Sequence, residues 1–111
     1  MTNQLFLKMN DNCQIPVVGL GTWKSEPGET TSQAVLDSLE AGYRHIDTAR
    51  AYDNETDVGR AVNDSGLPRE DLFITTKLWN QHQGYEEAIE ACEKSLNRLN
   101  CDYIALYLIH W

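Results

Sequence analysis

The sequence has 111 residues, of which 41% are hydrophobic and 23% charged, a composition that fits one compact domain. Its 17 acidic residues against 9 basic ones give a net charge of −8, which argues against binding to nucleic-acid phosphates. It lacks both an apolar run of about 18 residues and a secretory signal pattern, which predicts no membrane span and a cytoplasmic location.

The cysteines and histidines do not form the pattern of a disulfide framework or a metal site. Cys13, Cys92 and Cys101 are odd in number and form no Cys-x-x-Cys pair, whereas structural zinc needs four closely spaced ligands. We therefore expect reduced thiols, as is usual in the cytosol, and no bound metal.

A hairpin, a strand and a helix are expected in the first part of the chain. Gln4–Met9 and the segment Cys-Gln-Ile-Pro flank an Asn-Asp-Asn turn, which is typical of a β-hairpin. Val17–Thr22 is apolar apart from its glycines and predicts a buried strand. Glu29–Ala41 is expected to be a helix, because Val35 and Leu39 lie one turn apart.

Strands and helices are expected to alternate through the rest of the chain. Tyr43–Thr48 and Phe73–Lys77 predict strands, and the apolar run Tyr103–Ile109 predicts a strand buried on both faces. Helices are expected over Asn54–Asp64 and Tyr85–Leu99. The apolar faces of these two helices hold Val58, Ala61 and Val62 in the first, and Ile89, Cys92, Leu96 and Leu99 in the second.

This alternation predicts an α/β fold with a parallel sheet, either an open doubly wound sheet or part of a (β/α)8 barrel. The segment Gly-Leu-Gly-Thr-Trp-Lys lacks the third glycine of the dinucleotide-binding fingerprint, which disfavours the open sheet. A complete barrel needs about 250 residues. We therefore expect residues 1–111 to form an N-terminal hairpin and the first four strands of a barrel, as one domain without internal boundary, truncated after the fourth strand.

Four chemically active side chains follow the predicted strands. Asp47 ends one strand, Tyr52 lies in the loop after it, Lys77 ends the next strand, and His110 follows the last. Neighbouring strands lie about 4.8 Å apart and their carboxyl ends share one edge of the sheet, so these side chains can meet at one site.

Together these groups fit the chemistry of carbonyl reduction. A free tyrosine titrates near pH 10, too high for an acid at neutral pH, but an adjacent lysine cation favours the phenolate. An aspartate can hold the lysine, and a histidine can orient a carbonyl oxygen, so the set could protonate a developing alkoxide. The hydride would have to come from a nicotinamide cofactor.

Each residue also has a simpler interpretation. Asp47 could cap a loop, Tyr52 could be a half-buried aromatic, and His110 could be a hydrogen-bonded core histidine. A different enzymatic hypothesis makes Lys77 a Schiff-base nucleophile in an aldolase-like barrel. The three tryptophans add weight to a site, because Trp23, Trp79 and Trp111 each follow a strand and could form an aromatic wall for an apolar substrate.

Four sequence blocks resemble those of the aldo-keto reductases, in the same order and with the same gaps. They are VVGLGTWKS, GYRHIDTARAYDNE, FITTKLWN and DYIALYLIHW. The resemblance extends over all 111 residues but over little more than a third of a family chain. It implies that Tyr52 is the proton donor, that Lys77 paired with Asp47 activates it, and that His110 orients the substrate carbonyl.

The resemblance also implies ligands and their binding residues. Gly21, Thr22, Trp23 and Asp47 would bind the nicotinamide end of the cofactor, NADPH or alternatively NADH. Trp23, Trp79, His110 and Trp111 would bind a small aldehyde or ketone. The hairpin would close the bottom of the barrel.

The family holds most of its cofactor through the second half of the barrel, to which nothing in these 111 residues corresponds. Two hypotheses follow: part of an NADPH-dependent carbonyl reductase, or a catalytically silent half barrel. Two copies of a half barrel could also associate to close an eight-stranded sheet.

Overall fold

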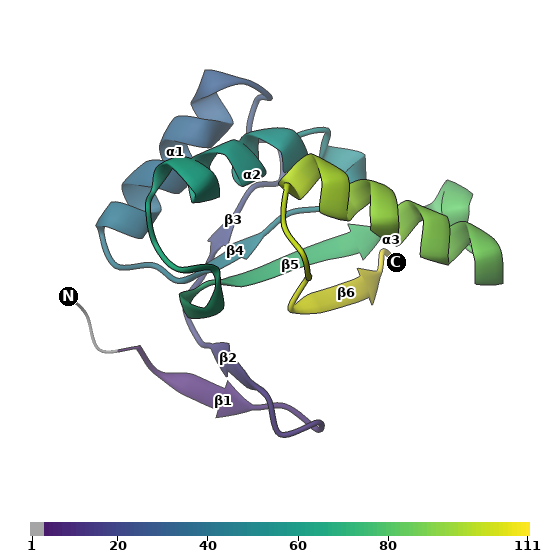
Figure 1. Cartoon of the computed structure of the whole chain (residues 1–111), viewed down its shortest axis with the longest axis horizontal. Coiled ribbons are helices and arrows are strands. Elements are labelled where there is room, and N and C mark those ends of the chain that lie inside the picture. The colour runs from purple at the N-terminus through teal and green to yellow at the C-terminus, as the bar shows by residue number, and fades with distance from the viewer. Residues whose placement is uncertain (1–3) are drawn as a thin grey trace.

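A computed structural model describes residues 4–111, in which a hairpin is followed by alternating strands and helices (Figure 1). The strands are β1 (Phe6–Lys8), β2 (Gln14–Pro16), β3 (Leu20–Gly21), β4 (His45–Asp47), β5 (Phe73–Leu78) and β6 (Leu106–Ile109). The helices are α1 (Glu29–Glu40), α2 (Glu55–Asp64) and α3 (Tyr85–Leu99), with short 3-10 helices at Arg50–Tyr52, Arg69–Asp71 and Asn80–His82. The predicted hairpin and the three predicted helices are confirmed, the third with the predicted bounds.

The last four strands form one parallel sheet in the order β3-β4-β5-β6. Each strand pairs with the strand before it in the sequence, and Gly21, Asp47 and Thr75 lie level with one another. A helix follows each of the first three of these strands, and the helices lie together over one face of the sheet (Figure 1). The predicted parallel sheet is therefore confirmed.

The hydrophobic core fills the space between this face of the sheet and the helices. Ile46 of β4 and Ile74 of β5 are fully buried and pack against apolar residues from all three helices. Side chains alternate along a strand, so Asp47 and Lys77 point to the opposite face of the sheet. That second face has no helix over it within residues 4–111 (Figure 1).

The hairpin lies at the amino ends of the sheet strands. The side-chain amide of Gln4 donates a 2.8 Å hydrogen bond to the carbonyl oxygen of Gly42, just before β4. At the start of β4, the Nδ1 atom of His45 lies 3.3 Å from the carbonyl oxygen of Pro16. The hairpin thus occupies the end of the sheet remote from Asp47 and Lys77.

The predicted strand over Val17–Thr22 is too long and only partly buried. β4 begins at His45, and Leu20 lies level with Ile46, so Val17 and Val18 lie before the start of β4 and do not pair with it. They are 50% and 54% exposed.

The last strand was also predicted incorrectly, because β6 is not buried on both faces. It begins at Leu106 rather than Tyr103, pairs only with β5, and leaves Ile109 74% exposed. The predicted buried face of α3 is likewise open at Ile89, whereas Leu99 at the other end is buried. Within residues 4–111, no further strand pairs with the outer edge of β6 and no element covers Ile109.

No helix within residues 4–111 is long and apolar enough to cross a membrane.

Candidate active site

An ion pair between β4 and β5 is the centre of the site. Asp47 is the last residue of β4 and lies level with Thr75, so the long side chain of Lys77 reaches it from the end of β5. The ammonium Nζ lies 3.0 and 2.9 Å from the two carboxylate oxygens of Asp47, and 3.0 Å from the carbonyl oxygen of Thr48. The predicted convergence of Asp47 and Lys77 is therefore present.

Tyr52 completes the coordination of this ammonium. It ends the 3-10 helix Arg50–Tyr52, and its hydroxyl oxygen lies 3.2 Å from the Nζ atom of Lys77. Because the ammonium donates to the hydroxyl oxygen, the phenolic proton remains available to donate elsewhere. Lys77 therefore presents its positive charge directly to the oxygen that would become a phenolate.

His110 follows β6 and lies against the same tyrosine. Its backbone amide donates to Leu78, and its ring packs edge-to-face on Tyr52, with the ring centroids 5.6 Å apart. Burial lowers the pKa of His110 below the ordinary 6.5, and the charge of Lys77 lowers it further, partly opposed by Asp47. The imidazole is therefore neutral at pH 7, and its buried Nδ1 has no hydrogen-bond partner within residues 4–111.

A cleft of about 360 Å³ opens beside Tyr52 and His110. The predicted substrate-binding tryptophans all line it, and Trp79 packs edge-to-face on His110 at 5.4 Å between ring centroids. The cleft is lined by Trp23, Lys24, Ala51, Tyr52, Trp79, His110 and Trp111. Aromatic walls around a phenol and an imidazole suit a small carbonyl compound with an apolar body.

The predicted cofactor residues differ in their accessibility. Gly21 lies level with Asp47, and a Cβ atom placed on it would have no neighbour within 4 Å, so open space adjoins the backbone there. Trp23 reaches the cleft, whereas Thr22 is buried and donates its hydroxyl to the Asp47 carbonyl oxygen. The open backbone at Gly21, level with Asp47, leaves room for a flat ring.

Three further residues of the site were not predicted from the sequence. The backbone carbonyl oxygen of Thr48 accepts a hydrogen bond from Lys77, and this contact could not be predicted because every residue type has a carbonyl group. Lys24 lines the cleft with its ammonium 4.8 Å from the ring centroid of Trp23, and Asn54 is fully buried. Asn54 directly precedes a helix, and in a sequence an asparagine at this position predicts only an N-terminal cap.

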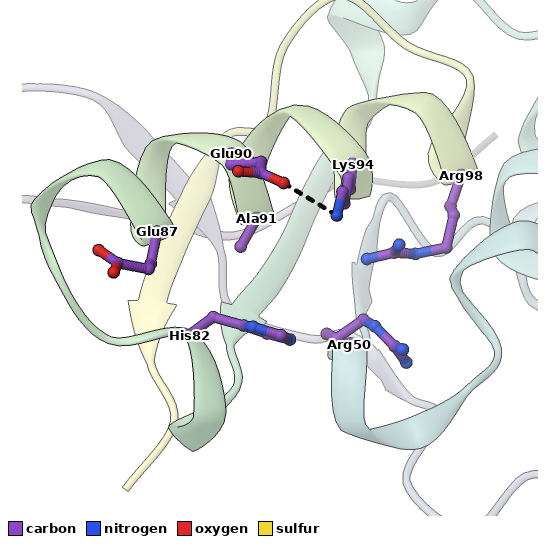
Figure 2. Close-up of a pocket in the computed structure, with 7 residues that line it drawn as sticks. All are labelled: Arg50, His82, Glu87, Glu90, Ala91, Lys94 and Arg98. Atoms are coloured by element: carbon purple, nitrogen blue, oxygen red, sulfur yellow. Dashed lines mark ion pairs between the residues drawn. The ribbon is translucent and has the colours of Figure 1, made fainter.

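A second cavity, of about 220 Å³, lies on the helical side of the sheet (Figure 2). It is lined by Arg50, His82, Glu87, Glu90, Ala91, Lys94 and Arg98, which gives it a basic appearance. Each long cation is nevertheless paired with a carboxylate: Arg50 with Asp53, Lys94 with Glu90, and Arg98 with Glu55. With its charge already balanced, this cavity does not compete with the aromatic cleft as a reaction site.

Comparisons with known proteins identify the family. Residues 17–111 match the model of the aldo/keto reductase family. The chain belongs to this family. An aldo-keto reductase of Mycolicibacterium smegmatis is 56% identical over 105 residues, which are 95% of this chain and 38% of the relative. An aldehyde reductase of Saccharomyces cerevisiae is 54% identical over 105 residues, 95% of this chain and 33% of the relative.

The fold agrees with this membership. The crystal structure of a Bombyx mori aldo-keto reductase in complex with NADP superposes with a TM-score of 0.92 at 41% identity, covering 100% of this chain and 39% of the other. This chain therefore spans little more than a third of the length of these aldo-keto reductases. Its parallel sheet and helices are part of a (β/α)8 barrel, as predicted.

Proposed function

We propose that these residues form the acid–base half of an NADPH-dependent reductase that converts aldehydes or ketones to alcohols, with Tyr52 as the proton donor. The observation that carries the proposal is the ammonium of Lys77, which contacts the Tyr52 hydroxyl oxygen and both oxygens of Asp47. A permanent cation beside a phenol offsets the negative charge that the phenol acquires on giving up its proton. General acid catalysis of this kind contributes about 10²- to 10⁴-fold in rate.

The other residues of the cleft have supporting roles. Asp47 and the carbonyl oxygen of Thr48 hold the ammonium in place beside the Tyr52 hydroxyl. His110, neutral and in contact with the Tyr52 ring, would donate a hydrogen bond to the substrate carbonyl oxygen and direct it towards the phenol. The tryptophans of the cleft would hold the apolar part of the substrate.

A nicotinamide cofactor, NADPH or alternatively NADH, supplies the hydride when bound. Gly21, Trp23 and Asp47 would hold its nicotinamide end, because the open backbone at Gly21 adjoins the ion pair. The NADP-bound relative supports NADP(H) as the cofactor class.

A chimeric enzyme tests this assignment. Residues 1–111 replace the corresponding N-terminal region of the Mycolicibacterium smegmatis relative, which is 56% identical to them over 105 residues. We expect the chimera to oxidise NADPH in the presence of an aromatic aldehyde, and Tyr52→Phe to reduce kcat by about 10²- to 10⁴-fold.

The matched control is Tyr85→Phe, because Tyr85 lies on α3 and is 85% exposed. It removes the same hydroxyl group and should leave kcat and KM unchanged. Undiminished reduction by the Tyr52→Phe chimera would show that another group donates the proton.

The observed contacts do not favour a Schiff-base mechanism at Lys77. Its Nζ atom donates to the two Asp47 oxygens and the Thr48 carbonyl oxygen, and a Schiff-base nitrogen would have to give up these hydrogen bonds. Borohydride reduction in the presence of an aldehyde should leave Lys77 unmodified, and a covalent adduct there would favour the aldolase hypothesis instead.

We further propose that residues 1–111 alone are catalytically silent. The cleft is open in the described chain, and Trp111 on its wall is 89% exposed. Water has free access to such a site, which weakens each electrostatic contact that the reaction needs. Turnover by the folded chain that is lost in Tyr52→Phe would disprove this silence while supporting the assigned donor.

A further inference from the structure

Asn54 is a fully buried side chain with a polar neighbour at each of its hydrogen-bonding positions. Its Oδ1 atom accepts from the hydroxyl of Thr48, at 2.7 Å, and lies 3.3 Å from the hydroxyl of Thr22, whose single proton is shared with the Asp47 carbonyl oxygen at 3.0 Å. Its Nδ2 group donates to the carbonyl oxygens of Thr22, at 2.9 Å, and Ser25, at 3.3 Å. A primary amide is the side chain that offers two acceptor and two donor sites in this form.

These bonds replace the local role that an asparagine usually has at this position. Asn54 directly precedes α2, yet its side chain makes no capping hydrogen bond to that helix. It turns instead towards residues about thirty positions earlier in the chain. The side chain thus connects two loops at the carboxyl ends of neighbouring strands.

Both connected loops carry parts of the active site. The first, Thr22–Ser25, follows β3 and presents Trp23 and Lys24 to the cleft. The second runs from Thr48, whose carbonyl oxygen accepts from Lys77, to Tyr52. Asn54 is therefore hydrogen-bonded both to the loop that carries Trp23 and to the loop that leads to Tyr52.

We propose that Asn54 is a positioning residue of the active site, which sets the separation between the Trp23 wall and the Tyr52 loop. The use of that separation in catalysis rests on the proposed function, whereas the placement itself does not. Replacing the amide with a carboxylate would set anionic oxygens against the two carbonyl oxygens of Thr22 and Ser25. The Thr22–Ser25 loop should then move away from Tyr52.

The test uses NMR spectra of the chain without cofactor or substrate. In Asn54→Asp we expect displaced resonances for the Trp23 indole, the Lys24 amide and the Tyr52 amide, while the hairpin resonances remain in place. In Thr48→Val, which removes a single bond to Oδ1, the same resonances should move by a smaller amount. This milder variant keeps the test valid if Asn54→Asp does not fold.

Val58→Ala is the matched control, because Val58 is buried in α2 and belongs to the core cluster. It should lower the melting temperature while leaving the Trp23 and Tyr52 resonances in place. Equal displacement in Val58→Ala, or none in either Asn54→Asp or Thr48→Val, would overturn the proposal. Since no reductase activity is measured, a silent chimera would count against the proposed function only.

Discussion

At the scale of single residues, the site is organised around one ammonium group with more acceptors than protons. Lys77 has three N–H donors and faces four oxygens, which belong to Asp47, Thr48 and Tyr52. The side chain of Lys77 is only 14% exposed, so little water competes for these donors. The ammonium is thereby held in one position, as a residue that stabilises a phenolate must be.

The two histidines of the open face predict how stability depends on pH. Burial lowers the pKa of both His45 and His110. Below the ordinary value of about 6.5, the unfolded chain therefore binds protons that the folded chain does not bind. We expect the free energy of unfolding to fall as the pH falls from about 7 to 5, by at most about 1.4 kcal/mol per pH unit for each histidine.

Urea denaturation at a series of pH values measures this slope. His45→Asn and His110→Asn should each reduce it, because each removes one group that titrates differently in the two states. A flat profile in the unmodified chain, or one that rises towards pH 5, would contradict the prediction.

The charged and aromatic residues of the site could be predicted from the sequence, but their supports could not. Asp47, Lys77 and His110 could be placed because each lies at or just after the carboxyl end of a strand, and parallel strands end at one edge of the sheet. Thr48 and Asn54 could not, since one acts through its backbone carbonyl and the other turns away from the helix that it precedes. At such positions, hydrogen bonds to residues distant in the sequence, and not the local preference of the residue type, determine its role.

At the scale of elements, the contact between α2 and α3 depends on a glycine. Gly59 lies within α2, where glycine normally costs about 1 kcal/mol relative to alanine. A Cβ atom at this position would lie 2.5 Å from the backbone oxygen of Leu99, at the end of α3. Backbone cannot rotate out of the way as a flexible side chain can.

We therefore predict that Gly59→Ala destabilises the chain, against the usual gain from alanine in a helix. Separating the two helices should cost about 1–3 kcal/mol, as overpacked cores generally do. Thermal denaturation with Asn63→Ala as the control provides the comparison, because Asn63 is exposed on the same helix and its replacement should be neutral or stabilising. Stabilisation by Gly59→Ala would show that the helices separate at little cost.

The elements themselves differ in how far the sequence predicts them. The bounds of α3 were predicted correctly because its apolar residues recur at the helical period. β3 was predicted too long because the length of a strand depends on its partner, and β4 begins only at His45. The exposure of β6 could not be predicted, because an apolar run shows that a segment favours burial but not whether another element covers it.

At the scale of the whole molecule, the described chain presents an open sheet edge beside exposed apolar side chains. The outer edge of β6 has no partner strand within residues 4–111, and Ile109 on this strand is largely exposed. Unpaired strand edges of this kind favour association with another chain. The net charge of −8 on each copy opposes it.

We predict that the isolated chain self-associates as its concentration rises, and more strongly at high salt, where the charge repulsion is screened. Light scattering after size-exclusion chromatography measures the molar mass. Ile109→Lys should keep the chain monomeric, because a lysine on an edge strand discourages pairing.

Ile89→Lys is the control for this experiment, since Ile89 is an exposed isoleucine on α3 and the substitution changes the charge equally. It should leave the association intact. A monomer at every concentration, or equal effects of the two variants, would show that the β6 edge is not the contact.

The sequential order of the sheet also bears on how the site arises during synthesis. Each strand pairs with the one made just before it, and Lys77 finds Asp47 only 30 residues earlier. Ribosomes add about 5–20 residues per second, whereas collapse of a short chain takes microseconds. A nascent polypeptide has all partners of this ammonium available within seconds of Lys77 leaving the exit tunnel, so the tyrosine acquires its charged neighbour early in translation.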